Sequence, residues 1–158
     1  MGDAAYRYRS ADEDSGRWHG FAFRPGDIVI STRSKSGTTW MQMICALLVF
    51  QTPDLPARLS RLSPWLDWLG TPLDDVVAHL EAQPHRRIVK THTPLDGVPF
   101  RDDVHYVVVG RDPRDVAVSW DELTELLAAD ATPEPASFLA FTVKVYVVPF
   151  WLASSSRV

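Results

Sequence analysis

Short apolar runs and helical periods alternate in the first third of the chain. The run from Asp27 to Thr32 follows the turn residues Pro25-Gly26 and predicts a buried strand. From Thr38 to Phe50 the apolar side chains recur at helical spacing, and Pro53 follows as a helix breaker. The pattern therefore predicts a strand that turns directly into a helix.

A second, shorter helical period follows an aromatic loop. The segment from Leu73 to Ala82 is amphipathic, with Thr71 as the expected N-cap and Pro72 at the first helical position. These start signals predict a helix that packs one apolar face against the strands.

Two further apolar runs complete the pattern. Residues Ile88 to Thr91 and Val104 to Val109 predict two strands, each bounded by charged or turn residues. Asp112-Pro113 is a helix start signal, and the apolar period behind it lasts to about Ala129. The order of the elements predicts an α/β fold, a parallel sheet with helical crossovers.

Composition narrows the class of protein. The chain has 158 residues, 46% of them hydrophobic, which is enough for one core. Its formal net charge is -4, so we expect no broad basic face and no nucleic-acid partner. The single cysteine, Cys45, lies among apolar neighbours and is expected to be a buried structural thiol.

Targeting and membrane signals do not stand out. The first twenty-five residues are polar and mixed in charge, unlike a secretory signal. The apolar run from Val143 to Ala153 is short and contains Pro149, so we expect no membrane span. A cytoplasmic location is the resulting expectation.

Polar clusters follow each of the three predicted strands. They are Arg33 to Thr39, Lys90 to Thr93, and Gly110 to Asp115. In parallel sheets, ligands bind beyond the carboxyl ends of the strands. We therefore expect the three clusters to form one shared site.

The first cluster has the composition of an anion cradle. Gly37 permits close backbone approach, Lys35 adds a positive charge, and the amides of Gly37 to Thr39 open the predicted helix. The lysine precedes the glycine, unlike the order in a Walker A loop, so a nucleoside triphosphatase ranks lower. The alternative is a hydroxyl-rich helix cap beside a solvated lysine.

The second cluster combines a cation with an imidazole. Lys90 and His92 are two apart on a strand and share a face. Histidine suits proton abstraction near neutral pH, so His92 is the expected base. The other histidines are expected to be ordinary surface or core residues; they are His19, His79, His85 and His105.

The third cluster offers an arginine and a hydroxyl. Arg111 ends a strand, and Ser119 lies two helical turns into the next element, so both can address one phosphate. The alternative is that Arg111 or Arg114 pairs with Asp112 or Asp115. Such exposed pairs contribute only about 0 to 1 kcal/mol.

Taken in order, these clusters resemble the soluble, cytosolic-type 3'-phosphoadenylyl sulfate (PAPS)-dependent sulfotransferases. The resemblance rests on Lys35 to Trp40, on Lys90 to His92, and on Arg111 with Ser119, and it runs from about Phe21 to Phe138. It implies a P-loop nucleotide-hydrolase-like fold. The loop from Ser63 to Trp68 is similar to the family's acceptor-pocket segment.

The resemblance also implies roles. His92 would take the acceptor proton, Lys35 would steady the leaving group, and Lys90 would assist at the sulfuryl group. No metal is implied, and the sequence shows no clustered metal ligands. The donor-binding residues it implies are Lys35, Ser36, Gly37, Thr38, Thr39, Trp40, Arg111 and Ser119.

The chain departs from the family pattern at two places. Arg33-Ser34 stands where many members carry tyrosine and proline, and no Arg-Lys-Gly loop is present. We expect a polar segment over residues 1–20, the N-terminal part of a sulfotransferase domain over 21–141, and an atypical apolar tail over 142–158. A truncated or frame-shifted chain is the corresponding hypothesis, with self-association through unpaired strand edges or the tail.

Two functions follow from this sequence. The first is an enzyme that transfers a sulfuryl group from PAPS to a hydroxyl or amine of a small-molecule acceptor, with His92 as base. The second is a non-catalytic nucleotide-binding remnant of the same family.

Overall fold

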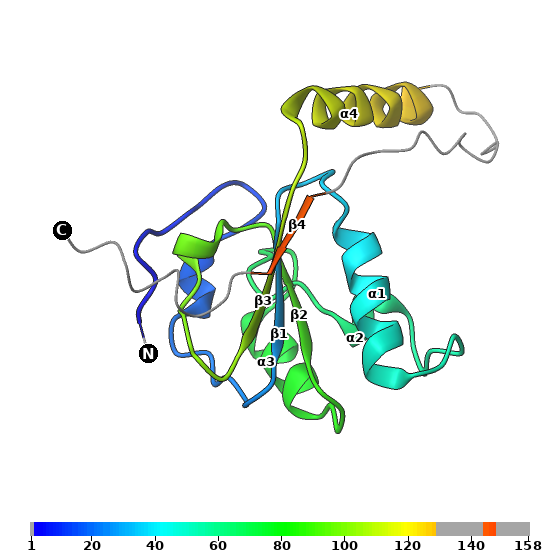
Figure 1. Cartoon of the computed structure of the whole chain (residues 1–158). Coiled ribbons are helices and arrows are strands. Elements are labelled where there is room, and N and C mark those ends of the chain that lie inside the picture. Colours follow the sequence, from blue (N-terminus) through cyan, green and yellow to red (C-terminus); the bar gives the residue numbers. More distant parts are fainter. Residues whose placement is uncertain (1, 129–143, 148–158) are drawn as a thin grey trace.

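The computed structural model describes residues 2–128 and 144–147 (Figure 1). The predicted helix end at Ala129 and most of the predicted tail lie outside these residues. The strands are β1 (Ile28–Thr32), β2 (Ile88–Thr91), β3 (His105–Gly110) and β4 (Lys144–Val147). The α-helices are α1 (Thr38–Phe50), α2 (Leu59–Leu62), α3 (Leu73–Glu81) and α4 (Pro113–Ala128), and the 3-10 helices are η1 (Ser15–Trp18) and η2 (Leu95–Gly97).

The described strands form one sheet in the order β2-β1-β3-β4. β1 pairs in parallel with β2 and with β3, so the predicted parallel α/β sheet is confirmed for these three strands. β4 runs antiparallel to β3 and falls within the segment that we expected to be an atypical tail. Ile30 pairs with Lys90 on one side and Val107 on the other, which brings the carboxyl ends of the parallel strands level.

The two connections between parallel strands differ. The chain from β1 to β2 contains α1, α2 and α3, as expected for a helical crossover. The chain from β2 to β3 contains only the 3-10 turn η2. In Figure 1, α4 lies beyond the carboxyl ends of the parallel strands rather than against a face of the sheet.

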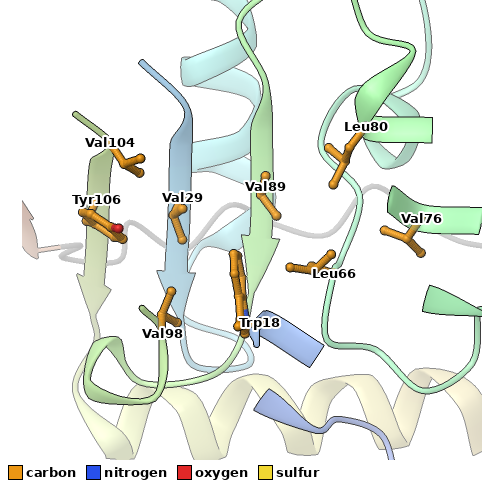
Figure 2. Packing of buried hydrophobic residues seen from close by; sticks show 9 residues of the cluster. All are labelled: Trp18, Val29, Leu66, Val76, Leu80, Val89, Val98, Val104 and Tyr106. Atoms are coloured by element: carbon orange, nitrogen blue, oxygen red, sulfur yellow. The ribbon is translucent and has the colours of Figure 1, made fainter. Parts of the chain in front are cut away.

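Alternate residues of β1 supply two hydrophobic clusters on opposite faces of the sheet. Ile28 and Ile30 pack with Cys45 and Ala46 of α1. Val29 packs on the other face, where its partners come from η1, β2, α3 and the loops; they include Trp18, Leu66, Leu80 and Val89 (Figure 2). The sheet is therefore covered by α1 on one side and by α3 with the N-terminal segment on the other.

The N-terminal segment contributes to the second cluster. Trp18 is 1% exposed, and its ring stacks on Phe23 at 5.8 Å between centroids. Its burial was not predicted, because one tryptophan in a polar stretch gives no periodic signal.

Helix α1 begins and ends where the sequence predicted. However, the face of the helix that is buried against the sheet is not the face that carries its largest apolar side chains. Met41, Cys45 and Ala46 are buried, whereas Trp40 is 63% and Leu48 66% exposed. Burial raises the pKa of the Cys45 thiol, which agrees with an inert structural role.

Helix starts follow the predicted signals in one case and not in the other. Asp112 Oδ1 accepts a hydrogen bond from the amide of Arg114 at 2.8 Å, so the predicted cap of α4 is confirmed. The predicted N-cap Thr71 is wrong, because Pro72 is itself the N-cap of α3, with extended backbone at φ -55° and ψ 136°. The carbonyl of Thr71 instead accepts from the Arg17 side chain at 2.8 Å.

A buried ion pair joins the beginnings of β1 and β2. The Arg87 guanidinium donates to both carboxylate oxygens of Asp27, at 2.9 Å and 2.5 Å, and both side chains are nearly inaccessible. The amide of Arg24 donates to the same carboxylate at 2.8 Å.

Within the described ranges, no helix is both long and apolar enough to cross a bilayer.

Candidate functional site

The three polar clusters predicted to share a site do contact one another. Arg111 Nη1, beyond β3, donates to the carbonyl of Lys35 at 2.8 Å. His92 Nδ1, beyond β2, lies 2.6 Å from the carbonyl oxygen of Thr32, and Arg33 Nη1 donates to the His92 carbonyl at 2.7 Å. The loop after β1 is therefore held on both sides by the turns after its neighbouring strands.

The loop from β1 to α1 fits an anion. Lys35 and Gly37 have positive φ values of 61° and 94°, and the amide of Ser36 closes a turn on Arg33 at 3.1 Å. Gly37 is the N-cap of α1 and provides no side-chain hydrogen bond. The first amides of a helix lack intrahelical partners, so this uncapped N-terminus beside a lysine suits a phosphate.

The alternative of a hydroxyl-capped helix does not match the geometry. The hydroxyl of Thr38 lies 2.5 Å from that of Thr32, so it links the helix to β1 rather than capping it. Ser36 is buried at 2% exposure, whereas Thr39 is exposed and lines a neighbouring cavity. Trp40 follows Thr39 with most of its surface exposed.

His92 is buried with a defined ring orientation. The Thr32 carbonyl can only accept, so Nδ1 carries the hydrogen, and Nε2 has the lone pair in the neutral ring. Trp65 packs edge-on against the imidazole at 4.6 Å between ring centroids. Burial lowers the pKa of His92, with the Lys90 charge adding to the effect, so the ring is held in its basic neutral form.

Lys90 lies on the same side of β2 as His92. Its Nζ is 4.4 Å from the centroid of the Trp65 ring. Burial lowers the pKa of Lys90, while the carboxylate of Asp67 acts in the opposite direction. Trp65 thus contacts both polar side chains of the predicted catalytic segment.

The side chains of Lys35 and Arg111 both lie near residues of α4. Lys35 Nζ is 5.9 Å from the ring centroid of Trp120 on α4. The Arg111 side chain is 6% exposed, and its Nε lies 3.9 Å from Asp115 Oδ2. The Arg111–Asp115 pair is therefore one of the pairs of the alternative interpretation, but its arginine is buried rather than exposed. Ser119 is half-buried on α4.

A cavity of about 780 Å³ opens next to Lys90 and Thr39. Trp65 and Trp68, which also line it, lie with nearly parallel rings 6.0 Å apart. The predicted aromatic segment from Ser63 to Trp68 therefore contributes to a cavity wall. Its polar lining includes side chains from α2 and α3, namely Arg61, Asp75 and His79.

Sequence reasoning missed several polar residues around this site. Asp75 and His79 are four apart on α3 and share a face, a spacing that was available as a signal. Glu13 and Asp67 are 9% and 0% exposed. Glu13 belongs to no recognisable motif, and Asp67 lies within the aromatic segment from Ser63 to Trp68 but was not singled out there. Glu13 Oε1 lies 3.6 Å from Arg33 Nη1, and burial raises the pKa of the Glu13 carboxyl.

In the part of the chain described, no group of three or more histidine, cysteine or acidic side chains is arranged to hold a metal ion.

Comparisons with known proteins agree on one family. The family model described as "Sulfotransferase domain" matches residues 25–149. A glycolipid sulfotransferase of Mycobacterium tuberculosis (strain ATCC 25177 / H37Ra) is 58% identical over 112 residues, which cover 71% of this chain and 34% of that protein. The mouse protein named sulfotransferase 1 family member D1 is 32% identical over 131 residues, covering 78% of this chain and 43% of the relative.

Solved structures give the same result. Retinol dehydratase in a complex with retinol and PAP superposes with a TM-score of 0.56 and 26% identity, over 70% of this chain and 43% of that one. The chain thus spans between a third and a half of the length of the relatives it matches.

Proposed function

Because the chain belongs to the sulfotransferase domain family, we propose that it transfers a sulfuryl group from PAPS to a small-molecule acceptor. The observation that carries the proposal is the convergence of the turns after β1, β2 and β3, with Lys35, His92 and Arg111 in them. Each of these side chains supplies what the reaction requires: a cation, a base and a second anion contact.

The residues present fit the donor nucleotide at both ends. Gly37, Thr38 and Thr39 offer the uncapped helix start to the 5'-phosphate, with Lys35 and Ser36 in the same loop. Arg111 and Ser119 are proposed for the 3'-phosphate, and exposed Trp40 for the adenine. When bound, the donor supplies sulfur activated by a phosphate leaving group.

His92 is proposed as the base. As the acceptor oxygen or nitrogen bonds to sulfur, its proton passes to His92 Nε2, because Nδ1 is occupied by the Thr32 carbonyl. The bond from sulfur to the bridging oxygen breaks, and its electron pair stays with the 5'-phosphate. Lys35 stabilises that negative charge, and Lys90 lies beside His92 to assist at the sulfuryl group.

A hydroxylated, glycolipid-like acceptor is the proposed substrate class. The relative with 58% identity is named a glycolipid sulfotransferase. The cavity supports this choice, because paired indoles suit the apolar face of a sugar and the polar side chains Arg61, Asp75 and His79 suit its hydroxyl groups. The cytoplasm is the proposed location.

Radiolabelled sulfate transfer tests the proposal directly. Purified chain is incubated with labelled PAPS and with glycolipids, phenols and alcohols, and labelled product is expected with glycolipids. His92→Ala should abolish the product, whereas His19→Ala, at an exposed position, should not. Label transfer that survives His92→Ala would contradict the assigned base.

The second candidate is nucleotide binding without turnover. It is kept because the matched relatives are about twice as long as this chain and are aligned over only 34% and 43% of their length. Calorimetric titration with 3'-phosphoadenosine 5'-phosphate separates the candidates: binding without transfer supports the remnant. Effective competition by ATP with magnesium would instead favour a kinase-like nucleotide site.

A further inference from the structure

Asp67 is a buried carboxylate that has no role in the proposed chemistry. It is 0% exposed and is not among the residues that line the cavity. One oxygen, Oδ2, accepts three hydrogen bonds, from Trp18 Nε1 at 3.0 Å, Thr91 Oγ1 at 2.5 Å and Thr93 Oγ1 at 2.7 Å. This carboxylate therefore joins the N-terminal segment to the end of β2.

The two threonines flank His92 in the sequence. Their hydroxyls bond to the same oxygen, and the amide of Thr93 donates to Thr91 Oγ1 at 2.9 Å. His92 makes its contacts elsewhere, with the Thr32 carbonyl and with the ring of Trp65. Trp65 and Asp67, two residues apart, thus hold the strand end from the imidazole side and from the threonine side.

Packing alone does not require a carboxylate here. A buried charge is costly, and apolar residues of similar volume commonly stabilise a core as well or better. Moreover, Asp67 Oδ1 has no hydrogen-bond partner within the described residues. An interior acid kept at this cost indicates a requirement for a fixed geometry.

We propose that Asp67 is a positioning residue that fixes the backbone on both sides of His92 and thereby holds its imidazole against the Thr32 carbonyl. The inference rests on the proposed function for the importance of His92, but its geometric part does not. Loss of the carboxylate releases Thr91 and Thr93, so the ring is free to rotate and to exchange tautomers.

Nitrogen NMR of the His92 ring tests the geometry without any turnover. In the wild-type chain the neutral ring should carry its hydrogen on Nδ1. In Asp67→Ala the Nε2–H tautomer, which free histidine prefers, should become the major form. The paired change Thr91→Val with Thr93→Val should act in the same direction while leaving the carboxylate in place.

Asp67→Asn separates charge from hydrogen bonding. The amide oxygen can still accept from the two threonines, so we expect the tautomer to be kept. The charge is lost, and because Asp67 raises the pKa of His92, that pKa should fall. Where turnover is measurable, Asp67→Ala should lower kcat by about 10- to 100-fold with an unchanged donor KM.

Asp14→Asn is the matched control. Asp14 is another buried acid of the same region, and its carboxylate accepts hydrogen bonds from the Arg7 guanidinium and from the amide of Gly16. The Asp14→Asn variant should leave the His92 tautomer unchanged. An unchanged tautomer in folded Asp67→Ala, or in the double valine variant if Asp67→Ala does not fold, overturns the positioning role. A wild-type chain that binds no nucleotide overturns the proposed function and leaves this result standing.

Discussion

At the scale of single residues, the protonation of His92 links the site to the stability of the chain. Burial lowers the pKa of His92 below its ordinary value of 6.5, so the folded state takes up its proton at lower pH than the unfolded state does. Between these two pKa values the unfolded state binds more protons. Stability contributed by this group is therefore fully present above the ordinary pKa and is lost as the pH falls from that value through the lower pKa of the folded state.

The corresponding prediction concerns the pH dependence of unfolding. The free energy of unfolding of the wild-type chain should rise as the pH increases toward the ordinary histidine pKa of 6.5, and His92→Gln should remove part of that rise, because glutamine does not titrate. Urea unfolding at a series of pH values measures both curves. Parallel curves for the two proteins would show that His92 titrates alike in both states.

Much of the composition of the candidate site was predictable from the sequence. The contacts that hold its side chains in place were not. Lys35, His92 and Arg111 stand in ordered motifs after predicted strands, and motif spacing is readable from sequence. The carbonyl of Thr32 that sets the His92 tautomer is a backbone group, which no sequence pattern marks. Asp67 acts across the fold on Thr91 and Trp18, so its contacts exist only once the chain is folded.

At the scale of elements, the beginnings of β1 and β2 depend on one another through the Asp27–Arg87 pair. Arg87→Met should lower the free energy of unfolding by about 3–5 kcal/mol, since it leaves the inaccessible Asp27 carboxylate without its cation. Arg58→Met, at an exposed position, should change it by less than about 0.5 kcal/mol. Equal effects of the two substitutions in urea unfolding would contradict a structural role for the pair.

The start of α4 depends on the side chain of Asp112. Asp112→Ala should destabilise the helix by about 1 kcal/mol, because the amide of Arg114 loses its acceptor. Faster hydrogen exchange in the first turns of α4, with unchanged exchange in α1, is the expected observation. Asp112→Ser, which restores a capping oxygen, should recover most of the protection.

Elements with strong local signals were predicted almost to the residue, and those fixed by tertiary contacts were not. The ends of α1 and β2 are confirmed as predicted, since a turn or a breaker adjoins each of them. The single helical turn of α2 and the 3-10 turn η1 are too short for periodicity. The antiparallel pairing of β4 is equally invisible in the sequence, because strand direction depends on the path of the connecting chain.

At the scale of the whole molecule, donor binding should raise thermal stability. A ligand that binds only the folded state stabilises it by about 2.7 kcal/mol at a hundred times its dissociation constant. We therefore expect 3'-phosphoadenosine 5'-phosphate to raise Tm by several degrees in differential scanning fluorimetry. Lys35→Ala should reduce the shift, and Arg58→Ala, away from the loop, should not.

Self-association through unpaired strand edges or the tail stays a prediction, and α1 offers a further surface for it. Several large apolar side chains of α1 are exposed, among them Trp40, Ile44 and Leu48. Sedimentation velocity should show a concentration-dependent increase in size, and Leu48→Lys should weaken it. A monomer at all accessible concentrations would contradict this expectation.

The left-handed backbone at Lys35 has a consequence for how this chain responds to selection. Its φ of 61° is a conformation that glycine adopts at lower energy than lysine, by about 1 kcal/mol. A random library screened only for heat resistance should consequently enrich glycine at this codon. A parallel library screened for retention on an immobilised bisphosphate nucleotide should keep lysine. The difference between the two populations would measure how much thermal stability is lost at this position by keeping a positive charge for nucleotide binding.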